Sequence, residues 1–168
     1  MSAAALPPVD ADLFRDAMRL TASGVTVITS SGAAGRVGVT VSSFGSLSMD
    51  PPAVVFCVHR ENRGLQALLE NGVFVANVLG HAHGRVAESF AGMIPELRED
   101  RFAAASWSQH STGAPVMDDA LCAFDCRVET VFDFASHRIV VGVVLGIRTA
   151  AATPLVYSDR AFRRLADA

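Results

Sequence analysis

The sequence is most restricted by two long alternating stretches in its second half. Residues 123–134 alternate apolar and polar side chains, and in residues 137–149 every second residue from Ile139 to Ile147 is a large apolar one. A period of two over this length predicts strands with one face in the core and one in water. Only Ala135 and Ser136 separate the two stretches, which is the length of a tight hairpin turn. We therefore expect a long antiparallel hairpin, with which the other elements must pair.

The rest of the chain predicts shorter elements. Their expected bounds are a helix over 10–21, helices near 65–71 and 84–92, and strands over 25–30, 37–42, 53–58, 73–79 and 154–157. Residues 93–120 are weakly patterned and predict a long excursion with one helical turn near Asp100; loops of this length are often functional. Hairpin-connected strands with short helices favour a mostly β fold, a closed antiparallel barrel, over a doubly wound sheet. No G-x-G-x-x-G follows a strand, so the usual dinucleotide-binding domain is excluded.

Composition sets limits on partners and location. With 168 residues, 51% of them hydrophobic, we expect one domain over 1–168, of which 1–9 form a disordered tail. A net charge of −3 without a Lys or Arg run predicts no nucleic-acid and no membrane partner. Three cysteines without C-x-x-C spacing and the lack of a signal-peptide pattern predict a cytoplasmic protein. The apolar excess predicts a homo-oligomer that covers an apolar face.

The strongest chemical signal lies in residues 37–52. The stretch begins as an alternating strand and then carries five hydroxyl side chains, Thr40, Ser42, Ser43, Ser46 and Ser48, before Pro51. Hydroxyls beside free backbone N–H groups at the end of a strand suit a ligand rich in carbonyl and phosphate oxygens. A serine-rich segment before two prolines is also typical of a plain surface loop, so composition alone leaves both interpretations open.

Segments spread along the chain resemble those of the short-chain flavin reductase family, the reductase components of two-component flavin monooxygenases. The segments that carry the resemblance are 14–29, 40–52 (T-V-S-S-F-x-S-x-S-x-D-P-P), 74–79, 90–92, 113–116, 126–128, 136–142 and 154–163. The resemblance implies an FMN-binding split β-barrel, antiparallel and Greek-key-like, that dimerises with flavin between the subunits. Two departures stand out. Asn62-Arg63-Gly64 replaces the family's S-x-T, and Ser136 replaces the aspartate before its histidine.

The resemblance also implies an activity. It is that of an NAD(P)H:flavin oxidoreductase, which reduces FMN or FAD by hydride transfer from NADH or NADPH. The homodimer would supply free reduced flavin to a separate monooxygenase component. A non-enzymatic flavin- or haem-binding barrel is the alternative that the two departures leave open, and a small-ligand carrier without a redox role is a third. The sequence does not distinguish FMN from FAD or NADH from NADPH.

The resemblance places His137 at the nicotinamide, as the catalytic residue that donates a hydrogen bond to the carboxamide. The cofactor-binding residues that it implies are Thr40, Val41, Ser42, Ser43, Phe44, Ser46, Val58, Asn62, Arg63, Asn77, His83, Phe90, His137 and Tyr157. Taken alone, His137 is equally typical of a turn. A buried amide such as Asn77 is either a structural clamp or a ligand contact. One of Arg60, Arg63 and Arg85 is expected at the flavin phosphate, and no metal site is expected.

Overall fold

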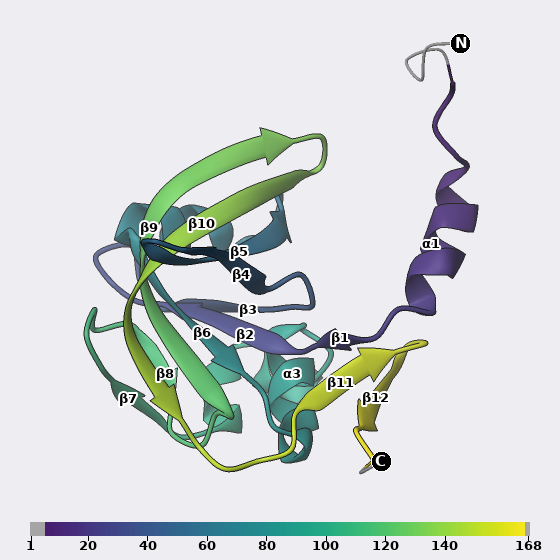
Figure 1. The fold of residues 1–168 in the computed structure, drawn as a ribbon. Helices are drawn as coiled ribbons and strands as arrows, with labels where there is room; N and C mark the ends of the chain where they lie inside the picture. The colour runs from purple at the N-terminus through teal and green to yellow at the C-terminus, as the bar shows by residue number, and fades with distance from the viewer. Residues whose placement is uncertain (1–5, 167–168) are drawn as a thin grey trace.

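A seven-stranded antiparallel sheet forms the body of the molecule (Figure 1). The computed structural model describes residues 6–166, so the first part of the expected tail 1–9 lies outside the described residues. The strands, in their order across the sheet, are β3 (Val37–Val41), β2 (Thr26–Ser30), β6 (Val73–Val78), β9 (Cys122–Phe134), β10 (His137–Thr149), β5 (Pro52–His59) and β4 (Gly45–Met49). Every neighbouring pair in this order is antiparallel, which confirms the predicted class.

The predicted long hairpin is β9 and β10, joined by a turn in which Ala135 has a φ of 48°. Its register pairs His137 with Phe134 and slips twice, between Val141 and Gly142 and again between Val144 and Gly146. Such irregularities bend a strand and increase its twist. The hairpin therefore curves, so that β9 pairs with β6 on one side while β10 pairs with β5 on the other.

The barrel is split, not closed. The sheet ends at β3 on one side and at β4 on the other, and the strand order contains no ladder between them in the described part of the chain. The expectation of a closed barrel is thus corrected to an open one. Inside it, Ile28, Phe56, Phe74 and Val140 form a core without exposure to solvent, with Phe56 and Phe74 edge to face at 5.2 Å. Their packing holds the two halves of the sheet together.

A second core lies between the sheet and the excursion over 93–120. This excursion holds the 3₁₀ helices η3 (Pro95–Leu97) and η4 (Arg101–Ala104) and a small hairpin of β7 (Trp107–Gln109) and β8 (Pro115–Met117). Trp107 packs on Phe90 and Phe102 and donates its indole N–H to the Phe102 carbonyl at 2.8 Å. The helical turn near Asp100 is confirmed by η4, whereas the sequence did not predict the hairpin.

The remaining helices are short. Two of them, α2 (Leu65–Asn71) and α3 (Gly84–Phe90), lie near their predicted positions, and a 3₁₀ turn, η2 (His81–His83), precedes α3. The strands β1 (Ser23–Gly24), β11 (Leu155–Ser158) and β12 (Ala161–Arg164) form a separate three-stranded sheet. No helix in residues 6–166 combines the length and the apolar character needed to cross a membrane.

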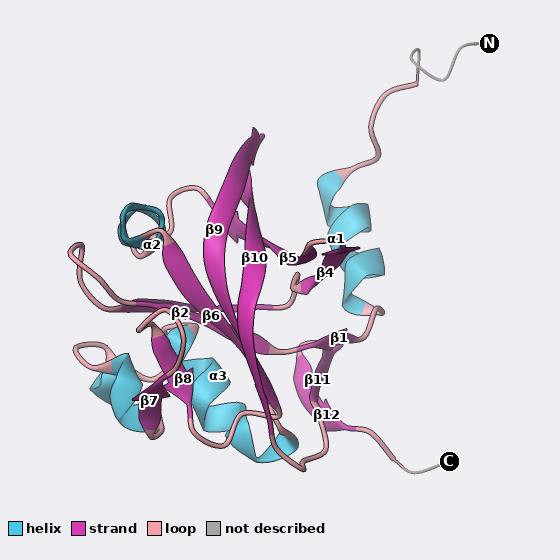
Figure 2. Cartoon of the chain, turned by 60° about the vertical axis from the view of Figure 1, so that its left-hand side comes forward, coloured by secondary structure: helices cyan, strands magenta, loops and turns pink. Residues whose placement is uncertain are grey.

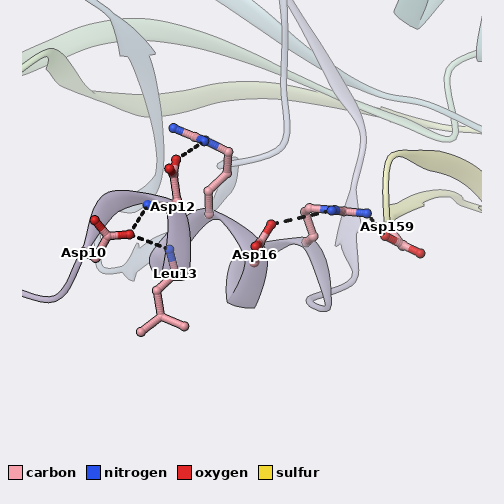
Figure 3. A network of polar contacts seen from close by, with 7 residues as sticks. Asp10, Asp12, Leu13, Asp16 and Asp159 are labelled. Atoms are coloured by element: carbon pink, nitrogen blue, oxygen red, sulfur yellow. Dashed lines mark hydrogen bonds and ion pairs between the residues drawn. The ribbon is translucent and has the colours of Figure 1, made fainter.

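The N-terminal helix α1 (Ala11–Arg19) stands away from the barrel (Figures 1 and 2). Asp10 caps it by accepting hydrogen bonds from the N–H groups of Asp12 and Leu13, and at its other end Arg19 pairs with Asp159 at 2.8 Å (Figure 3). The amphipathic pattern is as predicted, yet no residue of α1 is buried. Its apolar side chains therefore lie exposed in the single chain.

Helix α3 packs across β3, so the face of β3 that the alternation assigned to solvent is covered. The Thr40 hydroxyl donates to the Ala87 carbonyl at 2.7 Å. Two residues earlier, a Cβ built on Gly38 would lie 2.5 Å from Cε1 of Phe90. Only glycine leaves room for this ring, and Gly38 is therefore a packing requirement for the site described below.

Asn77 acts as a clamp inside the sheet. Its side chain is fully buried, and its Nδ2 donates to the Val27 carbonyl at 3.1 Å and to the Thr29 hydroxyl at 3.0 Å. Its Oδ1 accepts from the Met117 N–H at 2.8 Å. The amide thus joins β6, β2 and β8, which favours the structural one of the two roles expected for it.

We predict that Asn77→Ala lowers the free energy of unfolding by about 2 to 3 kcal/mol, because the Met117 N–H and the Val27 carbonyl lose their buried partner. Urea unfolding measures the change. Gln66→Ala is the control, since Gln66 bonds only to Glu70 on the surface and should shift stability by less than about 0.5 kcal/mol. Equal effects of the two changes would contradict the clamp.

We predict that Gly38→Ala destabilises the chain by about 1 to 3 kcal/mol, because the new methyl group forces the Phe90 ring away from β3. Gly45→Ala is the matched control: it lies in the edge strand β4, where an added Cβ meets nothing within 4 Å. Thermal unfolding compares the two. An unchanged midpoint for Gly38→Ala would show that Phe90 moves without cost.

Candidate functional site

A cavity of about 560 Å³ opens where β3, β5, β10, α3 and η4 meet. We call it the main cavity. Its lining residues are Gly38, Val39, Thr40, Val41, Cys57, Val58, His59, Glu61, Asn62, Arg63, Gly64, Phe90, Ala91, Arg101 and His137. Seven of the residues that the sequence implicated are among them: Thr40, Val41, Val58, Asn62, Arg63, Phe90 and His137. This volume and mixed lining are typical of a small-molecule site.

His137 lies on the rim of the main cavity, directly opposite His59 in the pairing of β10 with β5. The two rings meet edge to face, with their centroids 5.2 Å apart. The Ser136 hydroxyl lies 2.9 Å from Nδ1 of His137. Serine in place of aspartate thus keeps a polar partner for this nitrogen without adding a charge. When the hydroxyl donates to Nδ1, Nε2 carries the proton and can donate to a ligand.

The turn after β5 shapes one wall. Oδ1 of Asn62 accepts from the Gly64 N–H at 3.0 Å, and the Arg60 N–H donates to the Ser136 carbonyl at 3.0 Å. These bonds hold the turn against the start of β10. A Cβ on Gly64 would lie 3.3 Å from Cβ of Val37, a close contact. The loss of a hydroxyl at Gly64 therefore fits the tight approach of β3.

A second cavity of about 420 Å³ adjoins the main cavity, with which it shares Gly38, Arg63, Gly64, Phe90 and Arg101. We call it the arginine cavity, because four guanidinium groups line it, those of Arg36, Arg63, Arg98 and Arg101. Of the three arginines that the sequence suggested for a phosphate, Arg63 lies here. Arg85 pairs instead with Glu96 at 3.4 Å, and Arg60 lines neither cavity.

Arg101 is the main residue that the sequence did not predict. Its Nη1 donates to the Phe90 carbonyl at 3.2 Å, so the guanidinium is held beside both cavities. It follows the Asp100 cap of η4, inside the long excursion. The excursion itself was the available signal, since it was expected to be functional, but no pattern singled out this arginine. His59 was missed too, because a histidine at the end of a strand is ordinary in sequence.

The serine-rich stretch divides between several roles. Ser42 and Tyr157 line a smaller side cavity of about 180 Å³, which shares Thr40 and Val41 with the main cavity. The Ser43 hydroxyl bonds both the N–H and the carbonyl of Cys57, each at 2.9 Å. The N–H groups of Ser42 and Ser43 donate to no group within residues 6–166. Free donors at this strand end agree with the interpretation of the stretch as an anion-facing segment.

Besides Ser43, four predicted residues lie outside the three cavities. Phe44 packs against Phe124 with ring centroids 5.6 Å apart, and Ser46 is exposed on β4. Asn77 is the buried clamp described above. His83 accepts the Gly80 N–H at its Nδ1 and lies 3.1 Å from Asp119 through its Nε2. The structure therefore places these four residues away from the cavities.

The cysteines differ in their surroundings. Burial, with the negative charge of Asp125 adding to it, raises the pKa of the Cys126 thiol to about 12, and burial also raises the pKa of Cys122. Both thiols thus stay protonated near neutral pH. Cys57 is half-buried and lines the main cavity. No group of three or more His, Cys, Asp or Glu residues in the described chain is arranged to hold a metal ion.

Comparisons with known proteins agree with this geometry. A family model for the flavin reductase like domain matches residues 18–166. The FMN reductase (NADH) RutF 1 of a Methylorubrum extorquens strain is 39% identical over 165 residues, which is 98% of this chain and 81% of the relative.

Two solved structures show the same fold. One is nitrilotriacetate monooxygenase component B from Mycobacterium thermoresistibile, with a TM-score of 0.85 and 30% identity over 92% of this chain and 86% of that one. The other is the NADH:FAD oxidoreductase SgcE6 of Streptomyces globisporus C-1027, in complex with NAD and FAD fragments. It has a TM-score of 0.85 and 28% identity over 96% of this chain and 98% of that one. The resemblance drawn from the sequence is confirmed: the chain belongs to the flavin reductase-like domain family.

Proposed function

We propose that the chain is an NAD(P)H:flavin oxidoreductase that reduces FMN or FAD. The observation that carries this function is the main cavity, which places the His137 side chain and the unpaired guanidinium groups of Arg63 and Arg101 around one space of about 560 Å³. The free N–H groups of Ser42 and Ser43 directly follow β3, which forms one wall of this space. The relative from Methylorubrum extorquens is named for the reduction of FMN with NADH, which supports the same reaction here.

The residues present fit a bound flavin. Arg63 and Arg101 form no ion pair with a carboxylate of the described chain, so both guanidinium groups are available to a phosphate. The unused N–H groups of Ser42 and Ser43 suit the polar edge of an isoalloxazine ring, where they would stabilise negative charge. Val41 and Val58 supply apolar surface for the ring. When bound, the flavin supplies the chemistry, since it accepts a hydride from the nicotinamide.

The task of the protein is to position two rings. His137 stands at the rim with a polar partner at Nδ1, and we assign its Nε2–H to the nicotinamide carboxamide. Hydride transfer moves no proton from the carbon, so the histidine orients the donor and is not a base. His59 packs edge to face on His137 and restricts the rotation of its ring.

The alternative of a non-enzymatic flavin- or haem-binding barrel rested on Gly64 and Ser136. Ser136 bonds His137, and Gly64 fits the close approach of Val37. Neither departure disables the cavity, and no observation favours the alternative over the reductase. The cytoplasmic location and the choice between NADH and NADPH stay predictions.

We predict that the purified protein oxidises NADH when FMN or FAD is added, and that His137→Gln lowers kcat by about tenfold to a hundredfold by loosening the orientation of the nicotinamide. Absorbance at 340 nm measures the rate, and flavin fluorescence should give an unchanged Kd for FMN. His81→Gln is the control, because His81 is exposed and lines none of the three cavities. No turnover by the unmodified protein with either flavin would refute the proposed function.

We further propose that the chain works as a homodimer and passes free reduced flavin to a separate monooxygenase component. Phe132, Phe134, Leu145 and Ile147 are exposed on the projecting β9–β10 hairpin (Figure 2). Phe134 pairs directly with His137, so a second chain packed on this hairpin would close the rim of the main cavity. The neighbour from Mycobacterium thermoresistibile is itself named as one component of a monooxygenase, which supports the second step.

We predict that light scattering at micromolar concentration gives twice the chain mass of 17.7 kDa. Phe132→Glu combined with Phe134→Glu should yield a monomer that has lost most of its activity, because charges in an apolar contact remain unpaired. Leu165→Glu is the control, since Leu165 is exposed on the C-terminal segment, away from this hairpin. A fully active monomer of the unmodified chain would contradict the shared site.

A further inference from the structure

We propose that His59 is a positioning residue, which acts through His137 by setting the orientation of its imidazole ring. The inference rests on the proposed function and deepens it, because that function needs the Nε2–H of His137 to point in one direction. His59 lies directly opposite His137 in the ladder between β5 and β10. The two ring centroids are 5.2 Å apart, at an interplanar angle of 77°. Each ring therefore limits the space in which the other can turn.

The backbone beneath the two rings is held by hydrogen bonds across the strands and after them. The Arg60 N–H donates to the Ser136 carbonyl at 3.0 Å, next to the ladder pair of the two histidines. The His59 carbonyl accepts the Asn62 N–H at 2.9 Å, which closes the turn after β5. Because the backbone of both residues is held, the freedom that remains to His137 is rotation of its side chain.

The hydrogen bond from Ser136 does not remove this rotation. The Ser136 hydroxyl lies 2.9 Å from Nδ1 of His137, and both residues are exposed. A hydroxyl turns about its own C–O bond, and its neutral hydrogen bond is about half as strong as one to a charged group. It fixes one atom of the imidazole and leaves the ring plane free to tilt about that atom. A second contact is required to hold the plane, and the ring of His59 supplies it.

The ring of His59 can hold its neighbour because it is itself anchored. Its Nδ1 accepts the N–H of Glu61 at 3.3 Å. A backbone N–H can only donate, so Nδ1 of His59 carries the lone pair and the proton of the neutral ring lies on Nε2. The anchored ring meets His137 edge to face, which is an arrangement that aromatic pairs prefer. Ser136 thus restrains one atom of His137, and His59 restrains its plane.

An imidazole held in both ways points its Nε2–H in one direction. Misplacement of a reacting group by about 1 Å can cost about a hundredfold in rate, so a loss of this restraint should appear in kcat. His59 also lines the main cavity, and direct contact of His59 with the ligand is therefore the competing explanation. The two explanations differ in one respect. A residue that acts only through His137 has no further effect once His137 is replaced.

The test uses variants at these two positions. His59→Ala removes the ring, and His59→Phe keeps an aromatic ring for the edge-to-face contact but has no nitrogen. The third is the double variant of His59→Ala with His137→Gln. Absorbance at 340 nm gives kcat with NADH and FMN, flavin fluorescence gives the Kd of FMN, and thermal unfolding checks that each variant is folded. His81→Ala is the matched control, because His81 is exposed and lines none of the three cavities.

We expect His59→Ala to lower kcat by about fivefold to twentyfold, with the Kd of FMN unchanged within about twofold. His59→Phe should recover most of this loss, because the edge-to-face contact needs a ring and not a nitrogen. The double variant should have the kcat of His137→Gln alone within about twofold, since the plane of an absent imidazole cannot be restrained. His81→Ala should have the kcat of the unmodified protein.

The inference is overturned if His59→Ala has the kcat of the control. It is also overturned if the two losses multiply in the double variant, or if His59→Phe is as slow as His59→Ala, since either result would mean that the imidazole of His59 contacts the ligand itself. FMN binding that weakens in proportion to kcat would mean a structural role. Failure of the proposed function looks different: the unmodified protein then oxidises no NADH with either flavin, and the role of His59 falls with it.

Discussion

The pairing of β5 with β10 is the interaction on which the site depends. Its register sets His59 opposite His137 and continues to the pair of Ala53 and Val143. A slip by one residue would turn every side chain of one strand to the other face. Such a slip would bring either Phe56 of β5 or Val140 of β10, both fully buried, out of the core. The burial of those two residues therefore fixes the histidine pair, three residues along each strand, at the rim of the main cavity.

The opposite wall depends on a different contact, that of α3 with β3. Thr40 ties the two elements through the Ala87 carbonyl, and Gly38 lets the Phe90 ring lie directly on the strand. Phe90 in turn offers its carbonyl to Arg101 and its ring to Phe102. Gly38 thus permits the close packing of Phe90 on β3, and Phe90 in turn holds the guanidinium group of Arg101. The main cavity is the space between this wall and the β5–β10 pair.

The sequence predicted those parts of the fold in which the apolar or polar character of each residue indicates whether it is buried. Alternation located β9 and β10 within a residue, and the position of His137 at the start of β10 followed from it. It could not predict that β3 is covered on the face of Gly38, because this depends on where α3 packs. The sequence pattern could not predict the arginine cavity for the same reason. Arg36 comes from the β2–β3 turn and Arg98 from the excursion over 93–120, and only the tertiary fold brings them together.

The local arrangement of arginines also resolves an apparent conflict between net charge and ligand. A chain of net charge −3 should repel flavin and nicotinamide phosphates at long range. At physiological ionic strength, however, exposed charges are screened beyond about 8 Å, so the distant carboxylates contribute little at the cavity. Several acidic side chains are neutralised besides, as with Asp159 by Arg19 and Glu96 by Arg85. Within that distance an approaching phosphate meets the unpaired guanidinium groups of Arg36, Arg63, Arg98 and Arg101, which outnumber the two carboxylates of the same cavity, Glu99 and Asp100. The field at the cavity is therefore set by which arginines lack a carboxylate partner, not by the total charge of the chain.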